Sequence, residues 1–118
     1  MLCARPLNSS VRHLSVLQGW KPDAILRFVD YEWDEGKATG NLEKHGVPFE
    51  EASSVFADPL YIDFYDPDHS ADENRYLVIG TSEVGRLLIV SYTERGDVVR
   101  LISAREVTPA ERKAYEEG

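Results

Sequence analysis

The sequence has one cysteine, Cys3, among its 118 residues. A single thiol cannot form a disulfide within the chain, and it cannot build a cysteine-based zinc site alone. Because disulfides are typical of secreted proteins, their exclusion favours a reducing compartment, and we expect a cytoplasmic protein. The sequence also lacks any apolar run that approaches the roughly 20 residues of a membrane-spanning helix. We therefore expect no association with a membrane.

Several chemical motifs are missing as well. The sequence has no glycine-rich phosphate loop, no Cys/His set with zinc-ligand spacing and no Gly-x-Ser-x-Gly motif. The acidic residues of 66–73 do not place glycine and glutamate where an EF-hand loop needs them. We predict no cofactor and no metal. We interpret 66–73 as a solvated acidic loop, with a cation site as the alternative.

Positive charge is scarce, since 13 Lys and Arg residues stand against 21 Asp and Glu residues, for a formal net charge of −8. The acidic excess lies beyond residue 28, because residues 1–28 hold four basic side chains and one acidic side chain. A domain this acidic repels nucleic acid as a whole, so RNA or DNA binding requires a local basic patch. The strongest candidate is a set of arginines in the C-terminal third: Arg86, Arg95, Arg100 and Arg105.

The chain length suits one compact domain. Residues 1–24 show no sustained hydrophobic periodicity, and their apolar stretch is too short for a secretory signal. We interpret 1–24 as a flexible N-terminal extension and 25–118 as the folded domain. The charge asymmetry supports this division, because the first segment differs in sign from the rest.

Local signals predict the first elements of this domain. Residues 25–33 are rich in β-branched and aromatic side chains, which predicts a strand. Asp34 is a suitable N-cap for a helix over 35–45, and Gly46 predicts its left-handed end. A second helix is expected over 48–58, where apolar residues recur at spacings of three and four.

The second half predicts three strands and one more helix. The strands are expected over 75–82, 86–94 and 98–106, joined by short glycine-bearing turns. The middle strand is apolar on both faces, so it is expected to be central. Thr108 and Glu111 form a capping box that begins the last helix. The element order β-α-α-β-β-β-α predicts an α+β domain, with helices packed on a mainly antiparallel four-stranded sheet.

The ends of the last two strands hold candidates for a chemical site. By alternation, one face of the last strand carries Leu101, Ser103 and Arg105. One face of the strand before it carries Tyr92 and Glu94. If the hairpin register aligns these faces, Tyr92, Glu94 and Arg105 line one shallow site. The alternative is an ordinary surface of weak ion pairs.

Several residues of the predicted helices can also be interpreted either as functional or as structural. Lys37, Asn41 and Lys44 share one helix face, which is either a stripe for phosphate or a solvated surface. His45 either transfers a proton or bonds the last carbonyls of its helix. Tyr115 on the last helix is most simply a docking residue with its hydroxyl at the rim.

One long stretch carries a family resemblance. Residues 31–59, YEWDEGKATGNLEKHGVPFEEASSVFADP, resemble the opening of the BrnT toxin family: an aromatic-Glu-Trp-Asp start, then Lys, Asn and Lys-His-Gly-Val at matching offsets. The resemblance continues through YLVIG, YTERGDVVRLISARE and ERKAYEE. It covers residues 27–117, nearly the whole expected domain.

The resemblance implies a RelE-like fold and a type II toxin–antitoxin system. In such a system a ribonuclease toxin blocks translation until its antitoxin binds and masks it. The implied partners are an RNA substrate, free or on the ribosome, and a BrnA-like ribbon-helix-helix antitoxin. Operator DNA is then contacted only through the antitoxin.

The resemblance also implies which residues act. RelE-type enzymes cleave RNA without a metal, so they need cations against the phosphate charge and side chains that transfer protons. The catalytic candidates that match the family's motifs are Arg75, Glu94, Arg105, Tyr115 and His45. The RNA-binding candidates are Lys37, Lys44, Arg95 and Tyr92. Two other functions stay open: a non-catalytic partner of the same fold in an autorepressing DNA-binding complex, and a small-ligand or cation-binding domain.

Overall fold

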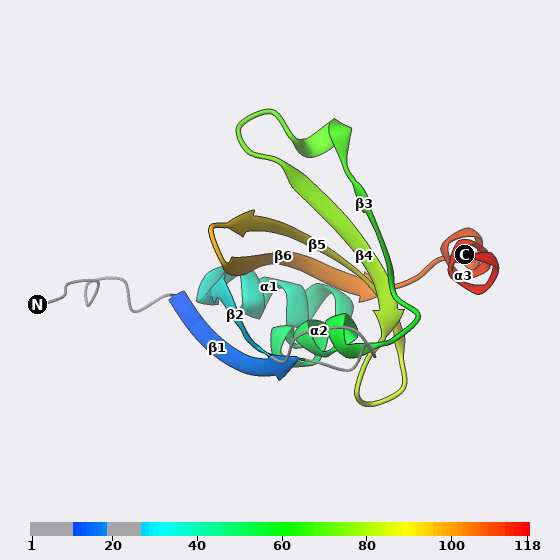
Figure 1. The fold of residues 1–118 in the computed structure, drawn as a ribbon, viewed down its shortest axis with the longest axis horizontal. Coiled ribbons are helices and arrows are strands. Elements are labelled where there is room, and N and C mark those ends of the chain that lie inside the picture. Colours follow the sequence, from blue (N-terminus) through cyan, green and yellow to red (C-terminus); the bar gives the residue numbers. More distant parts are fainter. Residues whose placement is uncertain (1–10, 19–26) are drawn as a thin grey trace, which may run out of the picture.

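The computed structural model describes residues 11–18 and 27–118 of the chain. These residues form a six-stranded sheet and three α-helices (Figure 1), and the strand order across the sheet is β1-β2-β6-β5-β4-β3. The strands are β1 (Val11–Gln18), β2 (Arg27–Asp34), β3 (Ile62–Tyr65), β4 (Arg75–Thr81), β5 (Leu87–Arg95) and β6 (Val98–Glu106). The helices are α1 (Glu35–His45), α2 (Phe49–Ser53) and α3 (Pro109–Glu117), with 3₁₀ turns η1 (Ser54–Ala57) and η2 (Pro67–His69).

The domain is α+β, as the sequence predicts, but its sheet has six strands and the prediction of four is wrong. One additional strand is β3, which pairs with β4 at one edge. Its side chains are exposed or half-buried, so no apolar alternation marks it in the sequence. The other is β1, which belongs to the segment expected to be a flexible extension and pairs with β2. Residues 1–10 and 19–26 lie outside the described part, and the domain boundary at residue 25 stays a prediction.

The strand pairings are antiparallel except between β2 and β6, which run parallel. Strand β5 lies between β6 and β4, in the central position that its two apolar faces predict. The parallel pairing brings Arg100 opposite Glu32, and their side chains form an ion pair with an Nη1–Oε2 distance of 2.7 Å. The beginning and the end of the domain therefore meet in the middle of the sheet.

The predicted helix ends are confirmed. Asp34 Oδ1 accepts hydrogen bonds from the backbone N–H groups of Gly36 and Lys37, at 2.7 and 3.1 Å. Gly46 has φ = 71°, and its N–H donates to the carbonyl of Leu42, which ends α1 in the left-handed conformation that glycine favours. The capping box of Thr108 is present at the start of α3.

The second helix is shorter than the predicted 48–58. The structure has five residues of α2 followed by the 3₁₀ turn η1. Ser53 and Ser54 lie at the junction, and their hydroxyls donate to carbonyls three residues earlier, at 2.8 and 2.6 Å. Such bonds compete with the helical pattern of the backbone, which explains the tighter winding.

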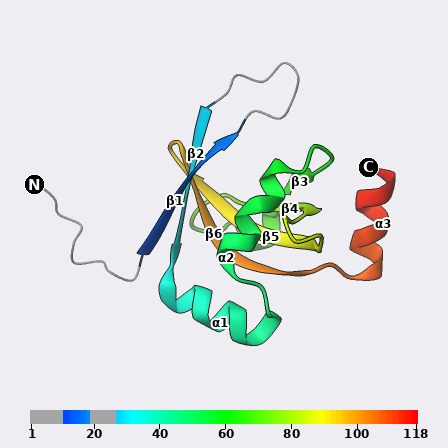
Figure 2. The same cartoon turned by 90° about the horizontal axis from the view of Figure 1, so that it is seen from below.

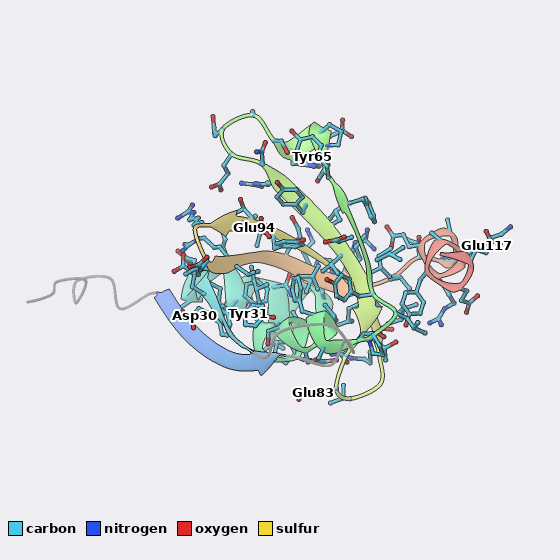
Figure 3. All side chains as sticks on the ribbon, viewed as in Figure 1. Asp30, Tyr31, Tyr65, Glu83, Glu94 and Glu117 are labelled. Atoms are coloured by element: carbon cyan, nitrogen blue, oxygen red, sulfur yellow. The ribbon has the colours of Figure 1, made fainter. Side chains whose placement is uncertain are left out.

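The two faces of the sheet are covered unequally. Helices α1 and α2 pack on one face over the main core, whose large members include Trp33, Phe49 and Tyr31. Tyr31 is labelled in Figure 3. Strand alternation places a smaller apolar cluster, centred on Ile79 and Ile89, on the opposite face, where α3 packs through Tyr115. Figure 2 shows α3 apart from α1 and α2, beyond the end of β6. We refer to this opposite, partly covered side as the open face.

Asn41 fastens α1 to the sheet. Its side-chain amide donates to the carbonyls of Ala104 and Val47, at 2.8 and 3.0 Å. Its oxygen accepts the N–H of Ala104 at 3.0 Å. The side chain is buried, so these bonds satisfy polar groups that water does not reach. Asn41 was predicted to share one exposed face with two lysines, but its side chain instead points into the protein.

Candidate active site

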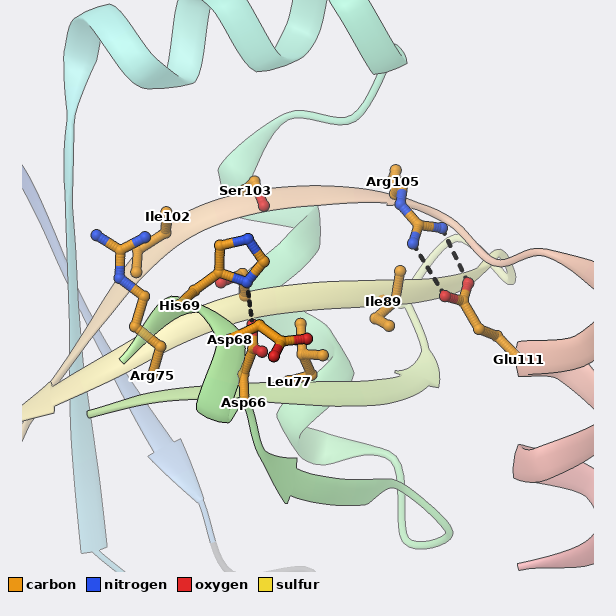
Figure 4. Close-up of a pocket in the computed structure, with 11 residues that line it drawn as sticks. Asp66, Asp68, His69, Arg75, Leu77, Ile89, Ile102, Ser103, Arg105 and Glu111 are labelled. Atoms are coloured by element: carbon orange, nitrogen blue, oxygen red, sulfur yellow. Dashed lines mark hydrogen bonds and ion pairs between the residues drawn. The ribbon is translucent and has the colours of Figure 1, made fainter. Parts of the chain in front are cut away.

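A pocket of about 410 Å³ lies on the open face (Figure 4). Strands β4, β5 and β6 form its floor, the η2 loop forms one wall, and the first turn of α3 contributes Glu111. Its lining combines cations, carboxylates, hydroxyls, an imidazole and aliphatic side chains. The lining residues are Asp66, Asp68, His69, Arg75, Leu77, Ile89, Ser91, Ile102, Ser103, Arg105 and Glu111.

A β-bulge between β5 and β6 shapes the floor of the pocket. Ser91 lies opposite Ser103, but the next residue of β5, Tyr92, lies opposite Leu101. Ile102 is therefore an extra residue without a partner in the ladder. As a result Ile102 and Ser103 both line the pocket, although they are neighbours in sequence.

The bulge overturns the expected grouping of side chains on β6. Leu101 is buried in the main core, whereas Ser103 and Arg105 line the pocket on the open face. Tyr92 is also in the main core, with 4% of its surface exposed. The expectation that Tyr92, Glu94 and Arg105 line one site is therefore wrong. Simple alternation fails because the extra residue inverts the faces on one side of the bulge.

Arg105 is held by α3. Its Nη1 and Nη2 atoms donate to Oε1 and Oε2 of Glu111, both at 2.9 Å. Glu111 Oε1 also accepts the N–H of Thr108 in the capping box, at 2.9 Å. The hydrogen bond from Arg105 lowers the pKa of Glu111, and the same bond raises the pKa of Arg105. Both groups therefore stay ionised, and the guanidinium is fixed at one end of the pocket.

Arg75, the first residue of β4, lines the pocket from another side. Its Nε atom is buried and has no hydrogen-bond partner. Within the described part of the chain, its guanidinium forms no ion pair either. A buried donor without a partner calls for an explanation, and an anion bound in the pocket supplies one.

His69 and Asp66 form a pair at the pocket wall. The His69 Nδ1 atom lies 2.9 Å from Asp66 Oδ2. The Asp66 side chain is 12% exposed and that of His69 is 68% exposed. The loop is tied to β4, because the N–H of Asp66 donates to the carbonyl of Arg75 and Ser70 Oγ accepts the N–H of Arg75.

Sequence reasoning considered His69 only as a possible ligand of the alternative cation site and gave it no part in catalysis, since the loop was interpreted as a solvated acidic segment. The usable signal was a histidine three residues after an aspartate, a spacing that lets the carboxylate orient the ring. The alternative of a cation site gains no support. In residues 11–18 and 27–118, no group of three or more His, Cys, Asp and Glu side chains is arranged to hold a metal ion.

Three candidates from the sequence lie on α1, on the other side of the sheet. Lys37 and Lys44 are exposed, and His45 is half-buried at the helix end. None of the three lines the pocket. The sheet and the main core separate α1 from the open face.

The candidates at the far end of β5 also lie outside the pocket. Glu94 is exposed close to the β5–β6 hairpin (Figure 3). Arg95 forms an ion pair with Glu73, at an Nη2–Oε1 distance of 3.3 Å. The Tyr92 hydroxyl donates to Asp63 Oδ2 at 3.2 Å, and burial raises the pKa of Tyr92 above its ordinary value. The buried ring leaves no face on which an RNA base can stack.

Tyr115 docks α3 onto the sheet. Its hydroxyl donates to Asp58 Oδ2 at 2.6 Å, and its ring packs on the cluster around Ile79 and Ile89. Burial, followed by the bond to Asp58, raises the pKa of Tyr115. This placement matches the docking interpretation, and the residue does not line the pocket.

The predicted basic patch of four arginines is not a free surface. Each guanidinium of the set is paired with a carboxylate, which reduces its attraction for nucleic acid. The pairs are Arg86–Glu51, Arg95–Glu73, Arg100–Glu32 and Arg105–Glu111. The positive charge available to an anion in the pocket therefore comes chiefly from Arg75.

Comparisons with known proteins identify relatives of the chain. The family profile described as "Ribonuclease toxin, BrnT, of type II toxin-antitoxin system" matches residues 33–111, which include every residue of the pocket lining. The crystal structure of the Brucella abortus ribonuclease toxin BrnT is 25% identical, with a TM-score of 0.48 over 64% of this chain and 92% of that chain. No curated protein matches. No helix in the described part of the chain is long and apolar enough to cross a membrane.

Proposed function

The chain belongs to the BrnT family of ribonuclease toxins from type II toxin–antitoxin systems, and we propose that it cleaves RNA in the pocket on the open face. The observation that carries this proposal is the guanidinium of Arg75, which lies in the pocket without a partner among the described residues. Arginine suits this task, since its planar fork of donors fits two phosphate oxygens at once.

The proposed reaction is a metal-independent attack of the 2′-hydroxyl on the adjacent phosphate, as in RelE-like ribonucleases. Arg75 binds the scissile phosphate and stabilises the charge that develops on it. Arg105 lies in the same pocket, and Glu111 holds it in one orientation. Arg105 adds positive potential at its own end of the pocket, away from Arg75. Preorganised cations of this kind supply most of the stabilisation that such a transition state requires.

The residues on α1 receive no catalytic part in this proposal. Lys37, Lys44 and His45 lie on the face of the sheet that α1 covers, away from the pocket. Tyr115 supports the position of α3, and through it the position of Glu111. Glu94 and Arg95 lie beyond the pocket on the exposed end of β5, and we propose that Arg95 contacts the flanking part of a longer RNA.

We further propose that the toxin acts in the bacterial cytoplasm and is neutralised by a BrnA-like ribbon-helix-helix antitoxin. Covering the open face is sufficient for neutralisation, because it closes the pocket. The complex then reaches operator DNA through the antitoxin. The net charge of −8 of the chain supports this assignment of DNA binding to the antitoxin, since an acidic toxin has little affinity for DNA of its own.

The test is to express the chain alone and measure growth and RNA integrity, then to assay the purified protein with and without ribosomes. We expect growth arrest and RNA cleavage that EDTA does not prevent. Arg75→Ala abolishes both, while Arg112→Ala, a change at an exposed arginine of α3, leaves both intact.

A second candidate function is that of a non-catalytic partner in an autorepressing complex. The pairing of four arginines with carboxylates favours it, because little free positive charge remains for RNA. This function is established if the wild-type chain neither arrests growth nor cleaves RNA, yet is required for its antitoxin to bind operator DNA.

A further inference from the structure

The imidazole of His69 occupies a position that the proposed function leaves without a task. In the view of Figure 4 it stands between Arg75 and Arg105, at the wall of the pocket. Its Nδ1 atom contacts Asp66, and its Nε2 atom has no partner among the described residues. The two arginines can stabilise charge but cannot accept a proton at neutral pH. Beside its two cations the pocket therefore holds an imidazole with a free nitrogen, together with the carboxylates of Asp66, Asp68 and Glu111.

The contact with Asp66 selects the tautomer of the ring. A carboxylate only accepts hydrogen bonds, so the proton of neutral imidazole lies on Nδ1 and donates to Asp66 Oδ2. The Nε2 atom then carries a lone pair. This is the arrangement in which a histidine acts as a base, because its orientation and its free nitrogen are both defined.

A purely structural task for the ring is poorly supported by its contacts. The His69 side chain is 68% exposed, and one bond to Asp66 is its side-chain hydrogen bond in the described structure. The loop is held by other groups, since Ser70 Oγ donates to the carbonyl of Asp66 and accepts the N–H of Arg75. The loop conformation therefore does not depend on the imidazole.

We propose that His69 is the general base of the RNA cleavage, and that Asp66 is a positioning residue that orients it. This inference rests on the proposed function. His69 Nε2 takes the proton of the 2′-hydroxyl, and the 2′-oxygen forms a bond to phosphorus. The bond between phosphorus and the 5′-oxygen breaks, leaving a 2′,3′-cyclic phosphate. The leaving 5′-oxygen takes its proton from water, which reaches the open pocket.

Several charged groups line the pocket with His69. The η2 loop supplies Asp66 and Asp68, β4 supplies Arg75, β6 supplies Arg105, and α3 supplies Glu111. Strand β5 contributes Ile89 and Ser91, which are uncharged. The acidic limb of the pH–rate profile should follow the loss of the proton from His69, because only the neutral ring can act as the base.

The experiment measures single-turnover cleavage of an RNA oligonucleotide across pH. We expect His69→Gln to lower the rate by about 10²–10⁴-fold and to remove the acidic limb. Added imidazole should partly restore His69→Ala. Asp66→Asn should lower the rate less than His69→Gln and should alter the acidic limb of the pH–rate profile. The imidazole is still present in this variant, but the carboxylate that orients it is lost. Asp72→Asn, an exposed change in the same loop, should behave as wild type.

A second substrate distinguishes whether His69 acts as the general base or as the general acid. A 5′-bridging phosphorothiolate has a leaving group that needs no proton, so it restores a variant that lacks the general acid and does not restore one that lacks the base. Recovery of His69→Ala on this substrate overturns the proposal, as does a His69→Gln variant with wild-type rate and pH profile. If either outcome is found for His69 while Arg75→Ala is inactive, the ribonuclease function stands and only the role of His69 fails. If the wild-type protein cleaves no RNA, both proposals fail together.

Discussion

Arg105 of β6 and Glu111 of α3 form a two-pronged ion pair, with both N–O distances at 2.9 Å. The same carboxylate closes the capping box of α3 through the N–H of Thr108. One side chain therefore begins a helix and orients a cation of the pocket. This arrangement couples the position of α3 to the geometry of the proposed site, and α3 has few other attachments besides Tyr115.

Replacing Glu111 should separate these two tasks. Glu111→Gln keeps an acceptor for the Thr108 N–H but loses the charge, so we expect a stability loss below about 1 kcal/mol because the pair is partly exposed. Glu111→Ala also loses the cap and should cost about 1–2 kcal/mol. Glu111→Gln loosens the two-pronged hold on Arg105 and Glu111→Ala removes it, so RNA cleavage should fall by up to about 100-fold. Urea unfolding and a cleavage assay measure the two effects.

The matched control for this prediction is Glu116→Gln. Glu116 lies on the same helix and pairs with Arg112 at 3.9 Å, with both side chains exposed. It should change neither stability nor cleavage measurably. Equal cleavage by wild type and Glu111→Gln would show that the orientation of Arg105 has no bearing on the reaction.

Breaking the pair of Glu51 and Arg86 should destabilise the domain at neutral pH. The Glu51 side chain is 8% exposed and accepts bonds from Arg86 and from Ser82 Oγ. Arg86 also donates to the carbonyl of Gly46, at 3.0 Å, and so ties the end of α1 to the pair. Glu51→Gln removes the buried counter-charge and leaves Arg86 only the exposed Glu106, 3.4 Å from its Nη1 atom, so it should cost about 3 kcal/mol.

The pH dependence of this effect has a definite sign. The hydrogen bond from Arg86 holds the pKa of Glu51 below its ordinary value of 4.5. A carboxyl with a lowered folded-state pKa stabilises the fold fully above its ordinary pKa, and this contribution disappears as pH falls through the lowered value. The difference between wild type and Glu51→Gln should therefore be constant near neutral pH and shrink below pH 4.5. Urea unfolding at a series of pH values tests this, and a difference that grows on acidification contradicts it.

Two glycines should respond to alanine with opposite signs. A Cβ at Gly80, on β4, meets the carbonyl oxygen of Val55 at 2.9 Å and Tyr61 Cβ at 3.3 Å. Gly80→Ala should cost about 1–3 kcal/mol, because the backbone of η1 must shift. At Gly40, in the middle of α1, a Cβ meets nothing within 4 Å. Gly40→Ala should stabilise by about 0.5–1 kcal/mol, since alanine is the better helix former. Thermal unfolding of the two variants compares them, and a stabilised Gly80→Ala contradicts the close approach of η1 to β4.

Local features of the fold were predictable from the sequence. The caps at Asp34, Gly46 and Thr108 are correct, because each is made by groups within a few residues of one another. The central position of β5 was also predictable, since only a strand covered on both sides tolerates apolar residues on both faces. The pairing of β3 with the sheet edge was not, because this short exposed run, although extended, has no hydrophobic pattern that marks it as a strand of the sheet.

The candidate site was only half predictable. Arg75 and Arg105 were named from the family resemblance, and the structure brings both into one pocket. The place of His69 in the pocket was not predicted, because nothing in the sequence shows that the η2 loop folds back over the strands. Tyr92 was misplaced because a single extra residue, Ile102, changes the register of β5 and β6.

The sequence by itself determined the helix ends, the strands with a clear apolar pattern and the membership of the BrnT family. The tertiary structure decided which arginines are neutralised by carboxylates and which side chains share the open face. The physical reason is the distance along the chain between the interacting residues. A cap depends on neighbours along the chain, whereas an ion pair such as Arg100–Glu32 joins residues far apart, and a bulge can invert which face a strand presents.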